Sequence, residues 1–170
     1  MFVLSVFFGC LQVIIHELGH YFAYLAYGYS PVLHYESVSC SQPIESWSAG
    51  IVISVAGFGL TVAISLVCLT LAYLTKNLVF GSLGIVMALR NVVALPFWPT
   101  YGADENNVSV ALGIPYFTLF IVVLLINLLT IGLIMNAFEK GRLGILTTTV
   151  SGGTIGMFLW ILWLGPKMLP

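Results

Sequence analysis

The sequence predicts an all-α integral membrane protein built as a bundle of about five transmembrane helices. Of its 170 residues, 60% are hydrophobic and 6% are charged, whereas soluble domains carry roughly 25% charged residues. Five segments reach the length of about 20 predominantly apolar residues that a membrane span requires. These segments are residues 2–27, 50–74, 78–98, 113–137 and 144–165. No internal repeat or long linker separates them, so we expect one multi-pass transmembrane domain over residues 1–170 in a cell membrane.

The connections between these segments differ in character. The first apolar segment is too long for a signal-peptide core of about 7–15 residues and has no basic stretch before it, so we expect it to remain as a spanning helix. Residues 28–49 are polar and contain Pro31 and Pro43, which favours a short irregular or β-rich loop. Residues 75–77 form a tight turn in this prediction. Residues 96–113 hold two prolines, two glycines and the only aspartate of the chain.

The few charges indicate an orientation and exclude one class of partner. Lys76, Lys140 and Arg142 fall on the side of the even-numbered connections, and the two long loops have neither lysine nor arginine. Because basic residues accumulate in cytoplasmic loops, this places the N-terminus in the cytoplasm, although Lys167 on the opposite side counts against it. A net charge of −1 excludes a nucleic-acid partner, since neutralising phosphates requires a basic surface.

A metal-binding pattern lies inside the first apolar segment. His16, Glu17 and His20 form HExxH, and on an α-helix the two histidines lie one turn apart on the same face, where both can bind one Zn²⁺. Glu17 lies beside them as the candidate general base toward an activated water. Two histidines and a glutamate are costly in hydrocarbon, so such a cluster indicates function.

A catalytic zinc needs a third protein ligand. Asp104 is favoured because the third span returns the chain to the side toward which the first helix carries its histidines, and residues 99–110 can then fold back toward the metal. Glu105 is adjacent and is the second choice. The remaining candidates are loop or turn residues, namely Glu36, Glu45, Glu139 and His34.

Two further motifs accompany His16-Glu17-Leu18-Gly19-His20 in the chain. They are Ala56-Gly57-Phe58-Gly59 and the Asn91…Pro96…Pro99…Asp104 stretch. Together the three motifs resemble the site-2-protease class of intramembrane zinc metalloproteases, in particular short members with little beyond the membrane core. The resemblance covers roughly residues 10–110, so a protease-like core over about 1–112 would be followed by additional helices over about 113–165. It implies Zn²⁺ as cofactor, His16, His20 and Asp104 as ligands, and Glu17 as the base.

The chain departs from the common pattern of that class. The family places its asparagine, two prolines and Asp-Gly closer together, whereas here Asp104 is followed by Glu105. Phe58 stands where many members have proline. The ligand assignment survives these differences, but the role of Asn91 stays open: it donates to substrate or to the tetrahedral oxyanion, or it bonds to a neighbouring helix.

Arg90 also has two interpretations. It lies inside an apolar run, which is costly unless it is paired or snorkels. It either pairs with Asp104, Glu105 or the oxyanion, or reaches a lipid headgroup or a backbone carbonyl; the sequence favours the second.

The leading hypothesis is therefore a zinc endopeptidase that cleaves transmembrane segments of membrane proteins. Its partners would be a membrane-protein substrate and the lipid bilayer. The alternative is a catalytically inactive, protease-like subunit or scaffold of a larger membrane complex, with partner subunits. A transporter is disfavoured because the chain has no repeat of the kind common in transporters.

Overall fold

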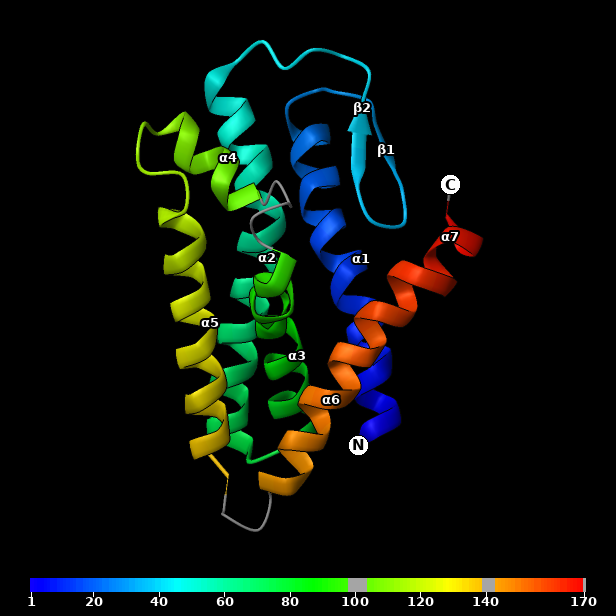
Figure 1. Cartoon of the computed structure of the whole chain (residues 1–170), viewed down its shortest axis with the longest axis vertical. Coiled ribbons are helices and arrows are strands. Elements are labelled where there is room, and N and C mark those ends of the chain that lie inside the picture. Colours follow the sequence, from blue (N-terminus) through cyan, green and yellow to red (C-terminus); the bar gives the residue numbers. More distant parts are fainter. Residues whose placement is uncertain (98–103, 139–142, 170) are drawn as a thin grey trace.

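A computed structural model of the chain describes residues 1–97, 104–138 and 143–169, and these residues are mostly helical (Figure 1). The helices are α1 (Phe2–Ala26), α2 (Trp47–Thr75), α3 (Leu78–Ala94), α4 (Asp104–Ala111), α5 (Thr118–Asn136), α6 (Leu143–Leu159) and α7 (Gly165–Met168). The two strands are β1 (Pro31–Leu33) and β2 (Val38–Cys40). A 3₁₀ turn, Leu95–Phe97, extends α3, and a π-helical turn, Trp160–Leu164, joins α6 to α7.

Four helical stretches in the described part of the chain are long and apolar enough to cross a membrane, and α3, with 17 residues, is shorter. The helical character predicted from the sequence is thus confirmed, and the fold is compatible with a multi-pass membrane protein. The four stretches are Phe2–Ala26, Trp47–Thr75, Thr118–Asn136 and Gly144–Met168.

Two predicted boundaries were wrong. The third segment was expected to reach residue 98, but its α-helix ends at Ala94, since Pro96 lacks the N–H that an α-helical hydrogen bond needs. The fourth was expected from residue 113, but α5 begins at Thr118. Gly113 has a positive φ of 69° and Pro115 follows, so this stretch forms a turn. The separate helix α4 was not expected.

The predicted loop and turn are present. The β1 and β2 strands pair antiparallel, with Pro31 opposite Cys40, which confirms a short β-rich connection after the first helix. At the other end of α2, Lys76 adopts a left-handed conformation with φ 52°. The Asn77 side chain then accepts a hydrogen bond from the Val79 amide and caps α3. Such an N-cap favours a sharp helix start directly after the turn.

Glycines bring α1 and α6 into backbone contact. A Cβ on Gly9 would meet the carbonyl oxygen of Gly153, and a Cβ on Gly156 would meet that of Val6. Small residues of this kind allow close helix packing where lipid supplies no hydrophobic driving force. Gly156 of α6 therefore packs directly against the backbone of α1.

The two ends of the bundle contain different structures (Figure 1). The N-terminus and the turn between α2 and α3 lie at one end. The β-hairpin, α4 and the C-terminal half of α1 lie toward the other. The Trp160 indole donates to the Tyr35 carbonyl over 2.7 Å and ties the π-helical turn to the hairpin. An apolar core, which includes Phe8, Ile85, Val86, Leu89, Ile134 and Leu146, joins α1, α3, α5 and α6.

Candidate metal centre

The two histidines of the motif lie on the buried face of α1. Their rings meet edge to face, with centroids 4.8 Å apart and planes at 85°. The Nε2 atoms of His16 and His20 are 3.1 Å apart, and both residues are buried. The one-turn spacing therefore directs two imidazole nitrogens to a single point.

Asp104 completes this cluster from a distant part of the chain. It is the first residue of α4, and its Oδ2 lies 3.1 Å from the Nε2 of His16 and 3.2 Å from that of His20. The ligand atoms of a tetrahedral zinc with bonds of 2.0–2.1 Å lie about 3.3 Å apart. The three atoms are thus spaced as three ligands of one such ion, and they come from the residues that the sequence singled out.

The protonation of His20 also fits a cation. Its Nδ1 lies 2.7 Å from the Ile53 carbonyl oxygen, and because a carbonyl only accepts, Nδ1 carries the proton. In the neutral ring Nε2 then presents a lone pair, as in metal-binding histidines held by a carbonyl. That lone pair faces the carboxylate of Asp104 and the ring of His16. A cation between these atoms relieves the repulsion, and two imidazoles with one carboxylate form a donor set that zinc accepts.

Helix α2 is shaped to accommodate the imidazoles. A Cβ on Gly57 would meet His20 Nε2, and would lie 2.7 Å from His16 Cε1. A Cβ on Gly19 would meet the carbonyl oxygen of Ala56. Helix α2 therefore approaches α1 closely at Gly19, and Gly57 leaves the space that the two rings occupy.

Arg90 also contacts the carboxylate of Asp104. Its Nη2 donates to Asp104 Oδ2 over 3.3 Å and its Nη1 to Glu105 Oε1 over 3.2 Å. The favoured prediction of a headgroup or carbonyl contact was therefore wrong. Burial by itself would raise the pKa of Asp104, but its contacts with His16, His20 and Arg90 outweigh burial and bring the pKa below its ordinary value. The carboxylate form, which a metal needs, is favoured.

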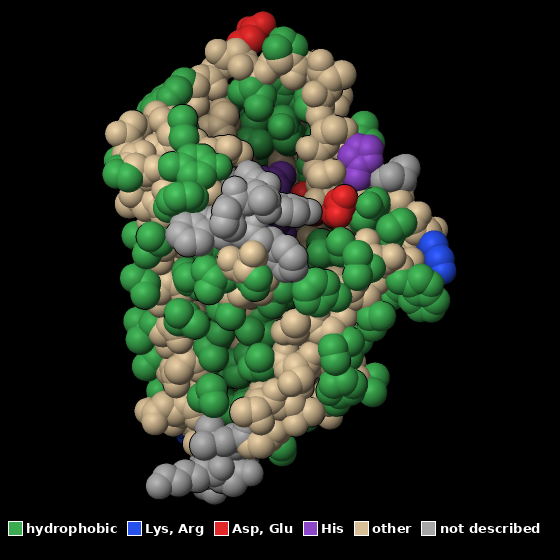
Figure 2. All heavy atoms as spheres, in the orientation of Figure 1, with side chains coloured by type: hydrophobic (Ala, Val, Ile, Leu, Met, Phe, Trp, Pro, Cys, Tyr) green, Lys and Arg blue, Asp and Glu red, His purple; other side chains and the backbone are tan. Residues whose placement is uncertain are grey.

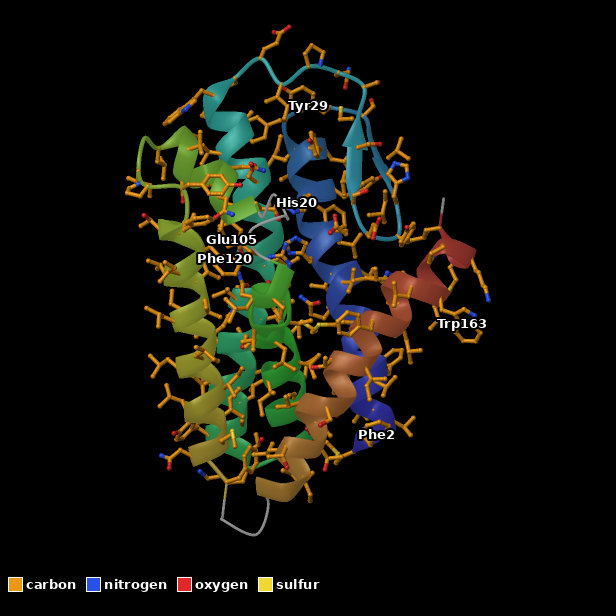
Figure 3. All side chains as sticks on the ribbon, in the orientation of Figure 1. Phe2, His20, Tyr29, Glu105, Phe120 and Trp163 are labelled. Atoms are coloured by element: carbon orange, nitrogen blue, oxygen red, sulfur yellow. The ribbon has the colours of Figure 1, made fainter. Side chains whose placement is uncertain are left out.

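Glu105 lies behind Asp104 in a polar network. It is fully buried, and its Oε1 also accepts from Asn91 Nδ2 over 2.8 Å. Asn127 of α5 donates in turn to Asn91 Oδ1 over 3.1 Å. Figure 3 labels His20 on α1, Glu105 on α4 and Phe120 on α5. Glu105 thus anchors α4 instead of joining the two imidazoles.

Asn91 bonds to neighbouring helices, which was the second of its two interpretations. Its amide links α3, α4 and α5, and it does not line the cavity described below. Sequence reasoning did not identify the network of Glu105 with Asn91 and Asn127. The sequence does show a polar residue in each of the three segments that became α3, α4 and α5. No rule of residue spacing, however, predicts that residues so far apart in the chain will bond to one another.

The three-residue cluster opens into a cavity of about 620 Å³. Glu17 lines it, with Oε1 3.9 Å from His16 Nε2, so its carboxyl group lies beside the three candidate ligands. Figure 2 shows a hollow in which histidine and acidic side chains are visible. The hairpin contributes Glu36, Ser37 and Val38 to the wall, and α6 with the π-helical turn contributes Met157, Phe158, Ile161 and Leu162.

The other ligand candidates do not join this cluster or lie outside the described residues; Glu36 lines the same cavity without ligand spacing to the histidines. His34 Nε2 is 2.8 Å from Ser39 Oγ within the hairpin, as expected of a loop residue. Among the described residues, the histidines, cysteines and acidic residues form one group spaced for a metal, which is His16, His20 and Asp104. Glu139 and the basic residues Lys140 and Arg142 fall outside the described part.

No family model matches the sequence, and no curated protein or solved structure is significantly similar to the chain. The functional assignment therefore depends on the residues and their geometry.

Proposed function

We propose that the protein is an intramembrane zinc metalloendopeptidase of the site-2-protease type, which hydrolyses peptide bonds in membrane-spanning segments of other proteins. One observation carries the proposal: His16, His20 and Asp104 converge with ligand spacing beside Glu17, in a cavity between apolar helices. The same helices support a multi-pass membrane protein. The basic residues favour a cytoplasmic N-terminus, with the hairpin and α4 on the opposite side.

His16, His20 and Asp104 would hold the zinc, which supplies Lewis acidity toward a water and a peptide carbonyl. Glu17 removes a proton from the attacking water as the new C–O bond forms. The same carboxyl group delivers that proton to the amide nitrogen as the C–N bond breaks. The Ile53 carbonyl fixes the ring of His20, and Arg90 with Glu105 positions Asp104.

The cavity is suited to an extended backbone. An intact helix protects its carbonyls by internal hydrogen bonds, so a membrane segment must unwind before it is cleaved. The β-hairpin lines the cavity through residues 36–38, and its strands offer an edge with which an unwound segment can pair.

Two measurements test this function. Metal analysis of the purified protein should find one zinc per chain in the wild type and a loss of zinc in His16→Ala and Asp104→Ala. Glu17→Gln should retain zinc and lose roughly 10²- to 10⁴-fold in cleavage rate, which is the contribution of a positioned general base. Cleavage is measured by terminal proteomics of membranes that contain either protein, with new termini inside apolar segments as the signal.

Glu45→Gln is the matched control, because Glu45 is exposed in the loop before α2 and should keep both zinc and cleavage. Wild-type cleavage by Glu17→Gln would refute the base assignment. Absence of cleavage by the wild type, together with stoichiometric copurification of other membrane proteins, would instead establish the inactive subunit or scaffold.

A further inference from the structure

Gln12 is a buried polar residue that the chemistry above does not use. It lies one helical turn before His16 on the buried face of α1 and is 1% exposed. It lines the same cavity as the metal-binding residues. Its Nε2 has no hydrogen-bond partner among the described residues. A buried amide donor without a partner is costly, so its position in a cavity indicates a ligand that the protein alone does not supply.

The other donors considered for substrate binding are already engaged. Asn91 donates to Glu105 in the network between α3, α4 and α5. Arg90 donates to Asp104 and Glu105. Gln12 therefore offers an uncharged donor on the cavity wall, a role that one of the two interpretations of the sequence gave to Asn91.

We propose that the Gln12 amide donates a hydrogen bond to a backbone carbonyl of the unwound substrate, one or two residues from the scissile bond; this inference rests on the proposed protease function. Side chains one helical turn apart are about 5–6 Å apart at Cβ, whereas an extended chain advances about 3.3–3.6 Å per residue. A carbonyl opposite Gln12 is thus offset by one or two residues from the carbonyl opposite His16.

Such a contact defines the class of substrate. A backbone carbonyl is exposed only where a membrane helix has lost its internal hydrogen bonds. Gln12 therefore recognises the unwound state and not a side chain. Segments weakened by glycine, asparagine or proline would be preferred, whatever side chains flank the cleaved bond.

The test uses the full-length protein in lipid vesicles and a synthetic, fluorescence-quenched apolar peptide of about 20 residues with a central Gly-Gly pair. Gln12→Met keeps a similar side-chain length without the donor, and Gln12→Leu is a second variant in case one does not fold. We expect KM to rise roughly tenfold with kcat nearly unchanged, as for a ground-state hydrogen bond that persists in the transition state. Peptide binding to zinc-loaded Glu17→Gln, with and without Gln12→Met, should weaken by the same factor.

Asn136→Leu, which removes an exposed amide at the far end of α5, should leave both constants unchanged. Unchanged KM and unchanged binding in the Gln12 variants would overturn the inference while leaving the protease function intact. Loss of zinc, or a fall in kcat alone, would also overturn it. If the wild type neither binds nor cleaves the peptide, the protease function fails and the inference fails with it.

Discussion

The two ends of the bundle are held together by different means. At the end with the hairpin and α4, buried and partly buried polar residues contact one another through imidazole, carboxylate and guanidinium groups around a cavity. Toward the N-terminal end, glycines bring α1 and α6 into backbone contact beside an apolar core. The first arrangement is suited to chemistry and the second to stability.

This difference separates the effects of mutation. A change among the polar residues should alter metal binding while leaving the helices packed. A change at the contact of α1 with α6 should alter the free energy of unfolding while leaving the metal affinity of the folded protein intact. Two glycines, Gly57 and Gly156, allow the comparison to be made with the same substitution.

The largest effect is expected from Gly57→Ala. The added methyl group would meet His20 Nε2 and displace both imidazoles. We expect zinc affinity to fall by more than about 100-fold, since changes beyond the direct ligands already cost 10- to 100-fold. Competition with a chromophoric chelator measures this affinity. Gly59→Ala is the control, because its Cβ would lie at an ordinary 3.5 Å from Val55; equal zinc affinity in both variants would contradict the geometry of the site.

A smaller effect is expected from Glu105→Gln. The substitution keeps the size of the side chain but removes the charge that pairs with Arg90, so Asp104 is less firmly positioned. We expect zinc affinity to fall by roughly 10- to 100-fold, as for residues that orient metal ligands. The same chelator competition is used, with Glu45→Gln as the exposed control. A wild-type affinity would show that the network does not support the metal centre.

The smallest effect on the metal is expected from Gly156→Ala. Its methyl group would meet the Val6 carbonyl and force α1 and α6 apart. We expect the free energy of unfolding to fall by about 1–3 kcal/mol, as for overpacked cores, with unchanged zinc affinity. Denaturant unfolding in detergent measures the first quantity. Gly132→Ala is the control and should not be destabilised, because its Cβ meets no described atom within 4 Å. A loss of zinc affinity in Gly156→Ala would show that the contact of α1 with α6 also supports the metal centre, and the two ends would then not differ in function.

Much of the site was predictable because helical spacing is local. The positions of His16, Glu17 and His20 follow from a period of 3.6 residues. The rough extent of the four long apolar stretches follows from hydropathy, whereas α3 is shorter than the span expected there. The convergence of Asp104 was expected because an odd-numbered span returns the chain to the same side. The space left by Gly57 was not predictable, since it depends on how α2 approaches α1.

The sequence alone determined a helical, strongly apolar chain with a HExxH pattern and one aspartate available for it. Only the tertiary structure decided that Arg90 contacts Asp104, that Asn91 faces Glu105 and Asn127, and that Gln12 lines the cavity. The physical reason is that helix formation depends on neighbouring residues. The choice of partner for a buried polar group instead depends on the rotation and approach of whole helices.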